Sequence, residues 1–170
     1  MKQSTLTDLY IEELEDLLGA ENQLVTALPN IIKAVESRKL ASALEAHLEE
    51  TRGQIDRLNQ VFKLLSKPAT KKTCEAMKGL LKEGDGAIED FEKGAVRDAA
   101  LIGACRRVEH YEMAAYCSTR HIAETLGFTD QVKLLEQTLE EESVADDTLT
   151  EIATSEVNIS ASKVPVATGR

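Results

Sequence analysis

The chain has 170 residues, of which 42% are hydrophobic and 4% aromatic, and its formal net charge at pH 7 is −10. The length suits one domain with a hydrophobic core, and the low aromatic content with only three prolines is typical of a mostly helical protein. No block of Lys or Arg is available for nucleic-acid phosphates, and no apolar run approaches the roughly 20 residues that span a bilayer, so neither partner is expected.

Two long segments with helical periodicity occupy the first part of the chain. The first runs from about Ser4, and its inward positions carry leucines, a tyrosine and one glutamate, Glu21. Pro29 is expected to kink or interrupt this helix, because proline lacks the amide donor and crowds the preceding turn. The second segment starts near Ser37, a residue suited to an N-cap, and runs to about Leu65.

A weakly periodic segment, residues 71–92, connects this pair of helices to the second half of the chain. Three glycines interrupt it, and glycine in a helix interior costs stability relative to alanine. The segment therefore predicts a short, broken connecting helix.

Two more long helices follow. The third is expected after Gly94 and should end at Gly127, a residue suited to the left-handed position that follows a helix end. The fourth is expected to begin after Thr129, as N-cap, and to run to about Glu156. The small, polar residues 157–170 predict a disordered C-terminal tail.

The order of these segments predicts the architecture. Short loops join the first helix to the second and the third to the fourth, so each pair should be antiparallel. The roughly thirty-residue link between the pairs is long enough to run the length of a bundle. We therefore expect an all-α, ferritin-like four-helix bundle over residues 1–156, with a long crossover that contains the short broken helix.

Acidic residues share the inward face of each predicted long helix with the leucines. A projection at 100° per residue places a carboxylate at or beside the inward stripe of every one of them. On the second helix the glutamate lies on the flank of the stripe, and a histidine lies within it. The candidate residues, in chain order, are Glu21, His47, Glu50, Glu109, Glu112, Glu142 and Asp146.

Buried carboxylates need compensation, because an unpaired charge in an apolar interior is very costly. Protons, arginines or metal ions could compensate. Arginine is available only locally, at Arg52, Arg57, Arg106 and Arg107. A pair of divalent ions would neutralise the carboxylates together, and di-metal four-helix bundles use one Glu from each of two helices and Glu-x-x-His from each of the others.

Several blocks of the sequence resemble a known family, the YciE/YciF family of ferritin-like proteins, and most closely its YciF branch. They are LYIEELEDLLGAENQLVTALP, HLEETRGQIDRL, CEAMKGLL, VRDAALIGACRRVEHYEMAAY and TLEEESVADDTLTEIA, and together they cover nearly the whole chain except the tail. The resemblance implies a ferritin-like bundle, a homodimer rather than a storage cage, and an association with stress responses.

The resemblance also implies a set of metal ligands, which are Glu21, Glu50, Glu109 and Glu142, with Glu112 as a further candidate. The chain departs from the Glu-x-x-His motif, because Gly53 and Ala145 stand where the two histidines would be. His47 and Asp146 lie close to these two positions and are candidate ligands instead. Asp146 could equally accept a hydrogen bond from a ligand rather than bind the metal itself. A site rich in oxygen ligands suits hard cations, and we expect two divalent metal ions, with iron favoured over manganese.

Two classes of function remain open at this point. In the first, a stress-associated protein holds the metal ions in its core and reacts with O2 or H2O2. In the second, a non-catalytic, dimeric structural protein carries a degenerate or weakly occupied site, and its glutamates are protonated, salt-bridged or solvated. The sequence leaves open whether the protein is an enzyme.

The cysteines point to the compartment. Cys74, Cys105 and Cys117 are odd in number and show no Cys-x-x-Cys spacing. Reduced, packed thiols in a cytoplasmic protein are the simplest interpretation.

Overall fold

The computed structural model describes residues 5–165 and contains only helices over that range. The predicted all-α class is confirmed. No described helix is both long and apolar enough to cross a membrane. The elements are α1 (Leu6–Ala34), α2 (Arg38–Leu64), α3 (Glu75–Asp90), α4 (Ala95–Thr125), α5 (Thr129–Ile152), a π-helical turn (Ala153–Val157) and α6 (Asn158–Ala161).

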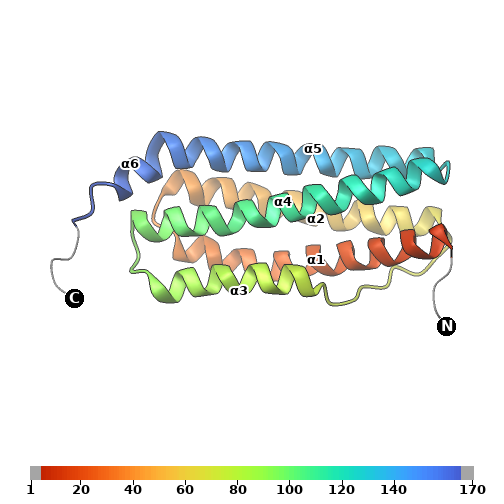
Figure 1. Cartoon of the computed structure of the whole chain (residues 1–170), viewed down its shortest axis with the longest axis horizontal. Coiled ribbons are helices and arrows are strands. Elements are labelled where there is room, and N and C mark those ends of the chain that lie inside the picture. The colour runs from red at the N-terminus through yellow and green to blue at the C-terminus, as the bar shows by residue number, and fades with distance from the viewer. Residues whose placement is uncertain (1–4, 166–170) are drawn as a thin grey trace.

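The four long helices lie side by side, and α1 and α5 run in one direction while α2 and α4 run in the opposite one (Figure 1). α1 packs against α2 and α4, and α5 packs against the same two helices, so the four surround a common core. The crossover from α2 to α4 returns along the length of the bundle, and its helix α3 packs on α1 and α4. This is the bundle with one long crossover that the sequence predicts.

Local signals in the sequence set several helix ends. Thr5 and Asp8 form a capping box at the start of α1, and Ser37 caps α2 as predicted. At the end of α4, Gly127 has a φ of 75° and Phe128 N donates to Ala123 O at 2.9 Å. This hydrogen bond completes a Schellman motif, and the predicted role of Gly127 is confirmed.

The predicted interruption at Pro29 is wrong, because α1 continues to Ala34. Leu28 and Ile31, on either side of the proline, are both buried in the core. Packing of this apolar stripe holds the last turns in place although one backbone hydrogen bond is lost.

The connecting helix also differs from the prediction, because α3 is unbroken over its 16 residues. Its Met77 and Gly84 are buried, and a Cβ on Gly84 would lie 4.0 Å from the Cβ of Ala104 on α4. Tertiary packing onto α4 therefore outweighs the weak helical propensity of the glycines.

Gly19 is required where the crossover meets α1. A Cβ on Gly19 would lie 1.8 Å from the carbonyl oxygen of Lys72. Any larger residue would push the crossover away from α1. The crossover thus rests directly on the helix that carries Glu21, two residues further along.

The C-terminal segment is ordered beyond the expected boundary at residue 156. Helical geometry continues through Ala161, and Val157 is 2% exposed within the core. Burial of this valine explains the extension, because it ties the last turns to the bundle. Of the tail expected over residues 157–170, residues 166–170 lie outside the described residues.

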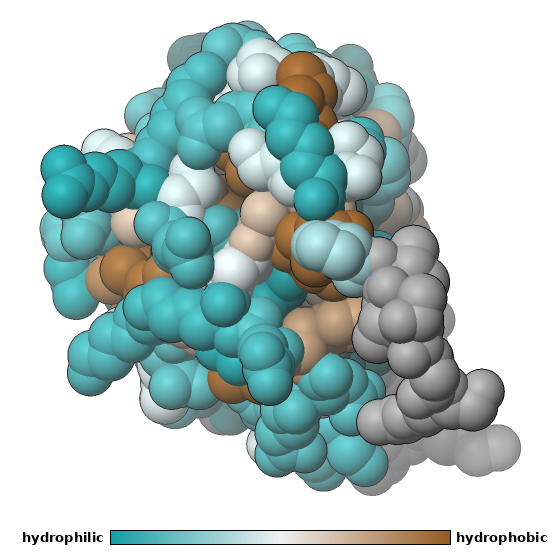
Figure 2. Space-filling view, turned by 90° about the vertical axis from the view of Figure 1, so that its left-hand side faces the viewer, coloured by the Kyte–Doolittle hydropathy of each residue, from teal (hydrophilic) through white to brown (hydrophobic). Residues whose placement is uncertain are grey.

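The interior contains two apolar clusters, one toward each end of the bundle. The cluster nearer to α6 includes Leu28, Leu40 and Ile152, and the other includes Tyr10, Phe62 and Leu135. The surface at the α6 end is mostly hydrophilic, with only small hydrophobic areas between polar groups (Figure 2). The apolar side chains are therefore largely internal, and the layer between the two clusters holds the polar residues.

Candidate metal centre

A buried polar layer crosses the bundle between the two apolar clusters. Every long helix contributes to it at the point where its apolar stripe changes from one cluster to the other. On α1, for example, Glu21 lies between Leu17 and Leu24, and on α5 Glu142 lies between Leu135 and Leu149. The members of this polar layer are Glu21, His47, Thr51, Gln54, Glu109, Glu112, Tyr116 and Glu142.

Four members of the layer converge closely enough to share a metal ion. His47, Glu109, Glu112 and Glu142 each offer a ligand atom, and these atoms all lie within 4.8 Å of one another. None of the four residues is more than 5% exposed. Helices far apart in the sequence thus bring three carboxylates and one imidazole to a single point.

Glu21 lies beside this group rather than within it. Its Oε1 accepts a hydrogen bond of 2.5 Å from the hydroxyl of Tyr116, and its Oε2 is buried without a hydrogen-bond partner from the described residues. Tyr116, on α4, is fully buried and orients the Glu21 carboxylate. One oxygen of Glu21 therefore remains available to a further ligand.

Gln54 is a polar-layer residue that sequence reasoning did not select. Its Nε2 donates a short hydrogen bond to Glu142 Oε1 and a longer one of 3.3 Å to Glu141 Oε2. The available signal was its place on the inward stripe of α2 beside His47 and Thr51, where an amide is as unusual as a carboxylate. Gln54 fixes the orientation of Glu142.

Many polar atoms of the layer have no hydrogen-bond partner among the described residues. Both oxygens of Glu112 and both ring nitrogens of His47 are buried with no hydrogen bond to the described residues. The same holds for one oxygen each of Glu21, Gln54, Glu109 and Glu142. Buried polar groups are nearly always satisfied in native proteins, so this concentration of unpaired atoms indicates a place for a bound ligand.

Burial disfavours negative charge on the layer. It raises the pKa of Glu112 well above the ordinary carboxyl value, and the charges of Glu21 and Glu142 raise the pKa further. The pKa values of Glu21 and Glu109 are raised for the same reason, again with a contribution from Glu142. Without a cation nearby, burial and mutual repulsion favour the protonated, uncharged form of these carboxyl groups.

The nearby arginine side chains do not neutralise the central carboxylates. Arg57 pairs with Glu141 and donates to Thr138 Oγ1 at 3.0 Å, and Arg106 donates to Asp146 at 2.7 Å. Each arginine thus neutralises a carboxylate at the edge of the core. The central carboxylates retain no such partner among the described residues.

Asp146 therefore lies outside the group of four. Arg106 holds it with two hydrogen bonds, of 2.7 and 3.1 Å, and His110 Nε2 lies 3.2 Å from its second oxygen. Arg106 lowers the pKa of Asp146, and His110 contributes in the same direction. Asp146 was predicted either as a metal ligand or as a supporting acceptor. In the structure it forms an ion pair at the flank of the core and does not lie among the converging ligands.

Glu50 is also placed apart from the group. Its side chain is 46% exposed, and its Oε2 lies 3.6 Å from His47 Nδ1 on the outer side of the imidazole. The histidine three residues earlier occupies the inward position of α2 instead. The helix contributes an imidazole to the centre and a carboxylate to the surface above it.

The donor set fits a divalent metal ion. Carboxylate oxygens dominate it, with one imidazole, and a mixed oxygen-rich set of this kind suits iron(II) and manganese(II). None of the cysteines belongs to it, and all three are free. Burial raises the pKa of the Cys105 thiol to about 12, which agrees with a packing role.

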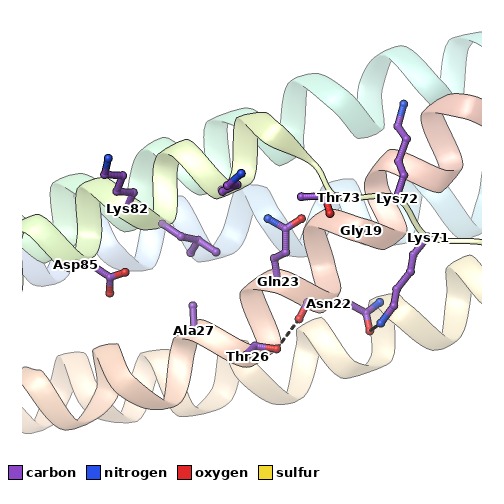
Figure 3. A pocket seen from close by; sticks show the side chains of 12 residues that line it. Gly19, Asn22, Gln23, Thr26, Ala27, Lys71, Lys72, Thr73, Lys82 and Asp85 are labelled. Atoms are coloured by element: carbon purple, nitrogen blue, oxygen red, sulfur yellow. Dashed lines mark hydrogen bonds between the residues drawn. The ribbon is translucent and has the colours of Figure 1, made fainter.

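A surface hollow of about 650 Å³, larger than the spaces beside the polar layer, lies elsewhere, over α1 and the start of α3 (Figure 3). It includes four lysines but no member of the polar layer. Three of these lysines are already engaged, Lys71 with Asn22, Lys72 with Glu12 and Lys78 with Glu75. Size therefore does not identify the functional site in this molecule.

Comparisons with known proteins agree with this fold. Residues 5–162 match the family described as a domain of unknown function, DUF892. Protein YciF of Escherichia coli (strain K12) is 46% identical over 159 residues, which are 93% of this chain and 96% of that protein.

Solved structures match over similar lengths. The crystal structure of the E. coli stress protein YciF has a TM-score of 0.88 at 44% identity, over 92% of this chain and 99% of that one. YcfI of Rhodopseudomonas palustris, described as a candidate structural protein, has a TM-score of 0.85 at 40% identity, over 86% and 94% of the two chains. A Xanthomonas campestris protein at 18% identity, with a TM-score of 0.74 over 94% of this chain and 98% of that one, shares the fold.

Proposed function

We propose that the buried polar layer of this chain, which belongs to the YciF-like family described as DUF892, binds divalent metal ions. This family membership confirms the resemblance inferred from the sequence. The observation that carries the proposal is the set of unpaired atoms on His47, Glu109, Glu112 and Glu142.

The number of charges supports two ions rather than one. Glu21, Glu109, Glu112 and Glu142 would together carry four negative charges if ionised, which two divalent ions neutralise. The free oxygen of Glu21 extends the donor set beyond the group of four. We therefore propose a site for two divalent metal ions with iron favoured over manganese, in which Glu21 completes the second ion's ligands.

The surrounding residues position the ligands. Tyr116 and Gln54 hold one oxygen each of Glu21 and Glu142, and the apolar clusters on both sides exclude water. Iron bound there would supply electrons to O2 or H2O2. This chemistry would suit a stress-associated protein, the description given to the E. coli relative.

Anaerobic titration of the purified, chelator-treated protein with Fe(II) tests metal binding. We expect about two ions per chain, and we expect the double variant Glu21→Ala/Glu109→Ala to lose both. The matched control is Glu45→Ala/Glu140→Ala, which removes two glutamates outside the polar layer of the same bundle. Absence of tight binding to the wild-type protein would contradict the proposal.

Consumption of O2 or H2O2 after loading with stoichiometric Fe(II) tests for a reaction. A rate above that of Fe(II) with the double variant supports a redox function. Metal binding without such a rate favours the alternative, a non-catalytic structural protein, which is the class named for the Rhodopseudomonas relative.

The homodimer implied by the family resemblance stays a prediction. Exposed apolar side chains are available for association, including Leu6 and Leu9 at 41% each. Size-exclusion chromatography with light scattering should give twice the mass of the chain, 18.6 kDa.

A further inference from the structure

A cavity of about 100 Å³ lies between α2 and α5 and reaches the polar layer from the surface side of Glu50. His47 and Glu109 line it together with Glu50, and the remaining walls are mostly alanines and apolar residues. The cavity therefore joins an exposed carboxylate to two of the four converging ligands.

His47 stands between the two carboxylates. Its Nε2 lies 3.5 Å from Glu109 Oε1, and its Nδ1 lies 3.6 Å from Glu50 Oε2. Both ring nitrogens lack a hydrogen-bond partner among the described residues, although the side chain is only 6% exposed. A metal-binding histidine normally donates a hydrogen bond from its second ring N–H to a carboxylate, a backbone carbonyl or water. Glu50 is the carboxylate that lies near Nδ1.

Small side chains keep this side of the bundle open. Ala46 and Ala145 both line the cavity, one from each helix. Ala145 is three residues after Glu142, the position at which a Glu-x-x-His motif would place an imidazole. An alanine at this position leaves room between the helices that a ring would otherwise occupy.

On the opposite side of the layer the space is far smaller. There α3 covers the bundle, and the cavity next to His47 and Glu109 measures only about 10 Å³, with apolar walls such as Leu28, Leu81 and Val108. A space of this size barely holds one water molecule. A hydrated cation has no comparable path through the described residues on that side.

Resting on the proposed metal site, we propose that the gap between α2 and α5 is the route by which divalent cations reach the polar layer, and that Glu50 is their first ligand. Its exposed carboxylate binds a cation that still keeps water ligands, as hard divalent ions prefer. His47 and Glu109 then take over the cation at the inner end of the cavity. Glu50 is thus assigned to uptake rather than to the converging set.

Stopped-flow mixing of the metal-free protein with Co(II), monitored by the absorbance of the bound ion, tests this route. Ala145→Leu fills the cavity and should slow loading by roughly tenfold or more, an added barrier of about 1.4 kcal/mol. Glu50→Gln should slow loading by roughly two- to fivefold through loss of local attraction. Equilibrium dialysis should show unchanged stoichiometry for both variants.

Matched controls make the same kinds of substitution at positions outside the cavity. Glu45→Gln neutralises an exposed glutamate on α2, and Ala114→Leu enlarges an exposed alanine on α4, and both should load at the wild-type rate. Circular dichroism checks folding, and Ala46→Leu, at an exposed wall position, replaces Ala145→Leu if that variant does not fold.

The outcomes separate this route from the metal site itself. Normal stoichiometry with unchanged rates in the cavity-filling and Glu50→Gln variants would overturn the route alone. Loss of Co(II) at equilibrium in Glu50→Gln would overturn the uptake role in favour of direct ligation in the centre. Failure of the wild-type protein to bind Co(II) would overturn the proposed function and the route with it.

Discussion

Helix α4 buries three carboxylates, and two of them, Asp98 and Glu112, have opposite surroundings. Asp98, near its start, is 1% exposed and accepts hydrogen bonds from the backbone amides of Glu36, at 3.0 and 3.2 Å, and of Ser37, at 2.7 Å. Glu112, about four turns later, is fully buried, and neither of its oxygens has a partner among the described residues.

The contrast shows how this fold separates a structural carboxylate from one available to a ligand. Where Asp98 ties the loop between α1 and α2 to α4, the chain supplies amide donors that satisfy it. Around Glu112 the neighbours are other carboxyl groups, which raise its pKa. A carboxyl group that is buried beside other carboxyl groups is costly to ionise unless a cation compensates the charge.

Removal of the satisfied carboxylate should have the largest effect. Asp98→Ala leaves the backbone amides of Glu36 and Ser37 without the acceptor that Asp98 provides, and we expect a loss of about 3 kcal/mol in the free energy of unfolding, or roughly 6–12 °C in Tm. The loss should be the same with and without metal. Thermal unfolding measures it, with Asp147→Ala, outside the polar layer, as the control; a loss that metal abolishes would contradict the structural role.

Removal of the unsatisfied carboxylate should have the opposite sign in the metal-free protein. Glu112→Leu replaces a buried, unpaired group by an apolar one of similar size, and we expect a gain of about 1–3 kcal/mol at pH 7. The rise in Tm that Fe(II) or Mn(II) confers on the wild type should at the same time shrink. Destabilisation of the metal-free variant would show that Glu112 is already satisfied.

The pH dependence of that gain is a further, smaller effect. Because the pKa of Glu112 is raised above 4.5 in the folded state, its contribution to stability is present below that pH and is lost as pH rises through the folded pKa. The advantage of Glu112→Leu over wild type should therefore be smallest near pH 5 and grow toward about pH 8. Urea denaturation of both metal-free proteins at the two pH values measures it, and a constant difference would contradict the shift.

Asp146→Asn should have the smallest effect and tests the boundary of the polar layer. Its salt bridge with Arg106 is partly exposed, so we expect a loss below about 1 kcal/mol. Because the pKa of Asp146 is lowered, this contribution is present above the ordinary value of 3.8 and disappears as pH falls below it. Metal stoichiometry should not change; a lost ion would return Asp146 to the ligand set.

Helical periodicity was sufficient to predict the four long helices and the burial of Glu21, Glu109, Glu112 and Glu142. An amphipathic helix places its residues on an inward or outward face by spacing alone, so a glutamate within a leucine stripe can be recognised from the order of residues. His47 was recognisable for the same reason. End signals such as Ser37 and Gly127 act within a few residues, which is why their positions were also predictable.

Residues at the edge of a stripe could not be assigned in this way. Glu50 was expected on the flank of its stripe, whereas Asp146 was expected within the stripe of α5 and lies at its edge in the structure. The surroundings of both depend on the rotation of each helix and on its neighbours. Arg106 takes Asp146 into an ion pair, and Glu50 remains at the surface. The hydrogen bond from Gln54 to Glu142 could not be predicted either, because it joins residues 88 positions apart and depends on how the two helices pack.

The amino-acid sequence by itself determined an all-helical chain whose long helices each carry a polar group in an apolar stripe, because local spacing decides which face a residue occupies. Tertiary packing decided which of those groups meet, kept α1 and α3 unbroken through Pro29 and the glycines, and opened the gap beside Ala145. These outcomes depend on contacts between distant segments, whose burial outweighs local propensity.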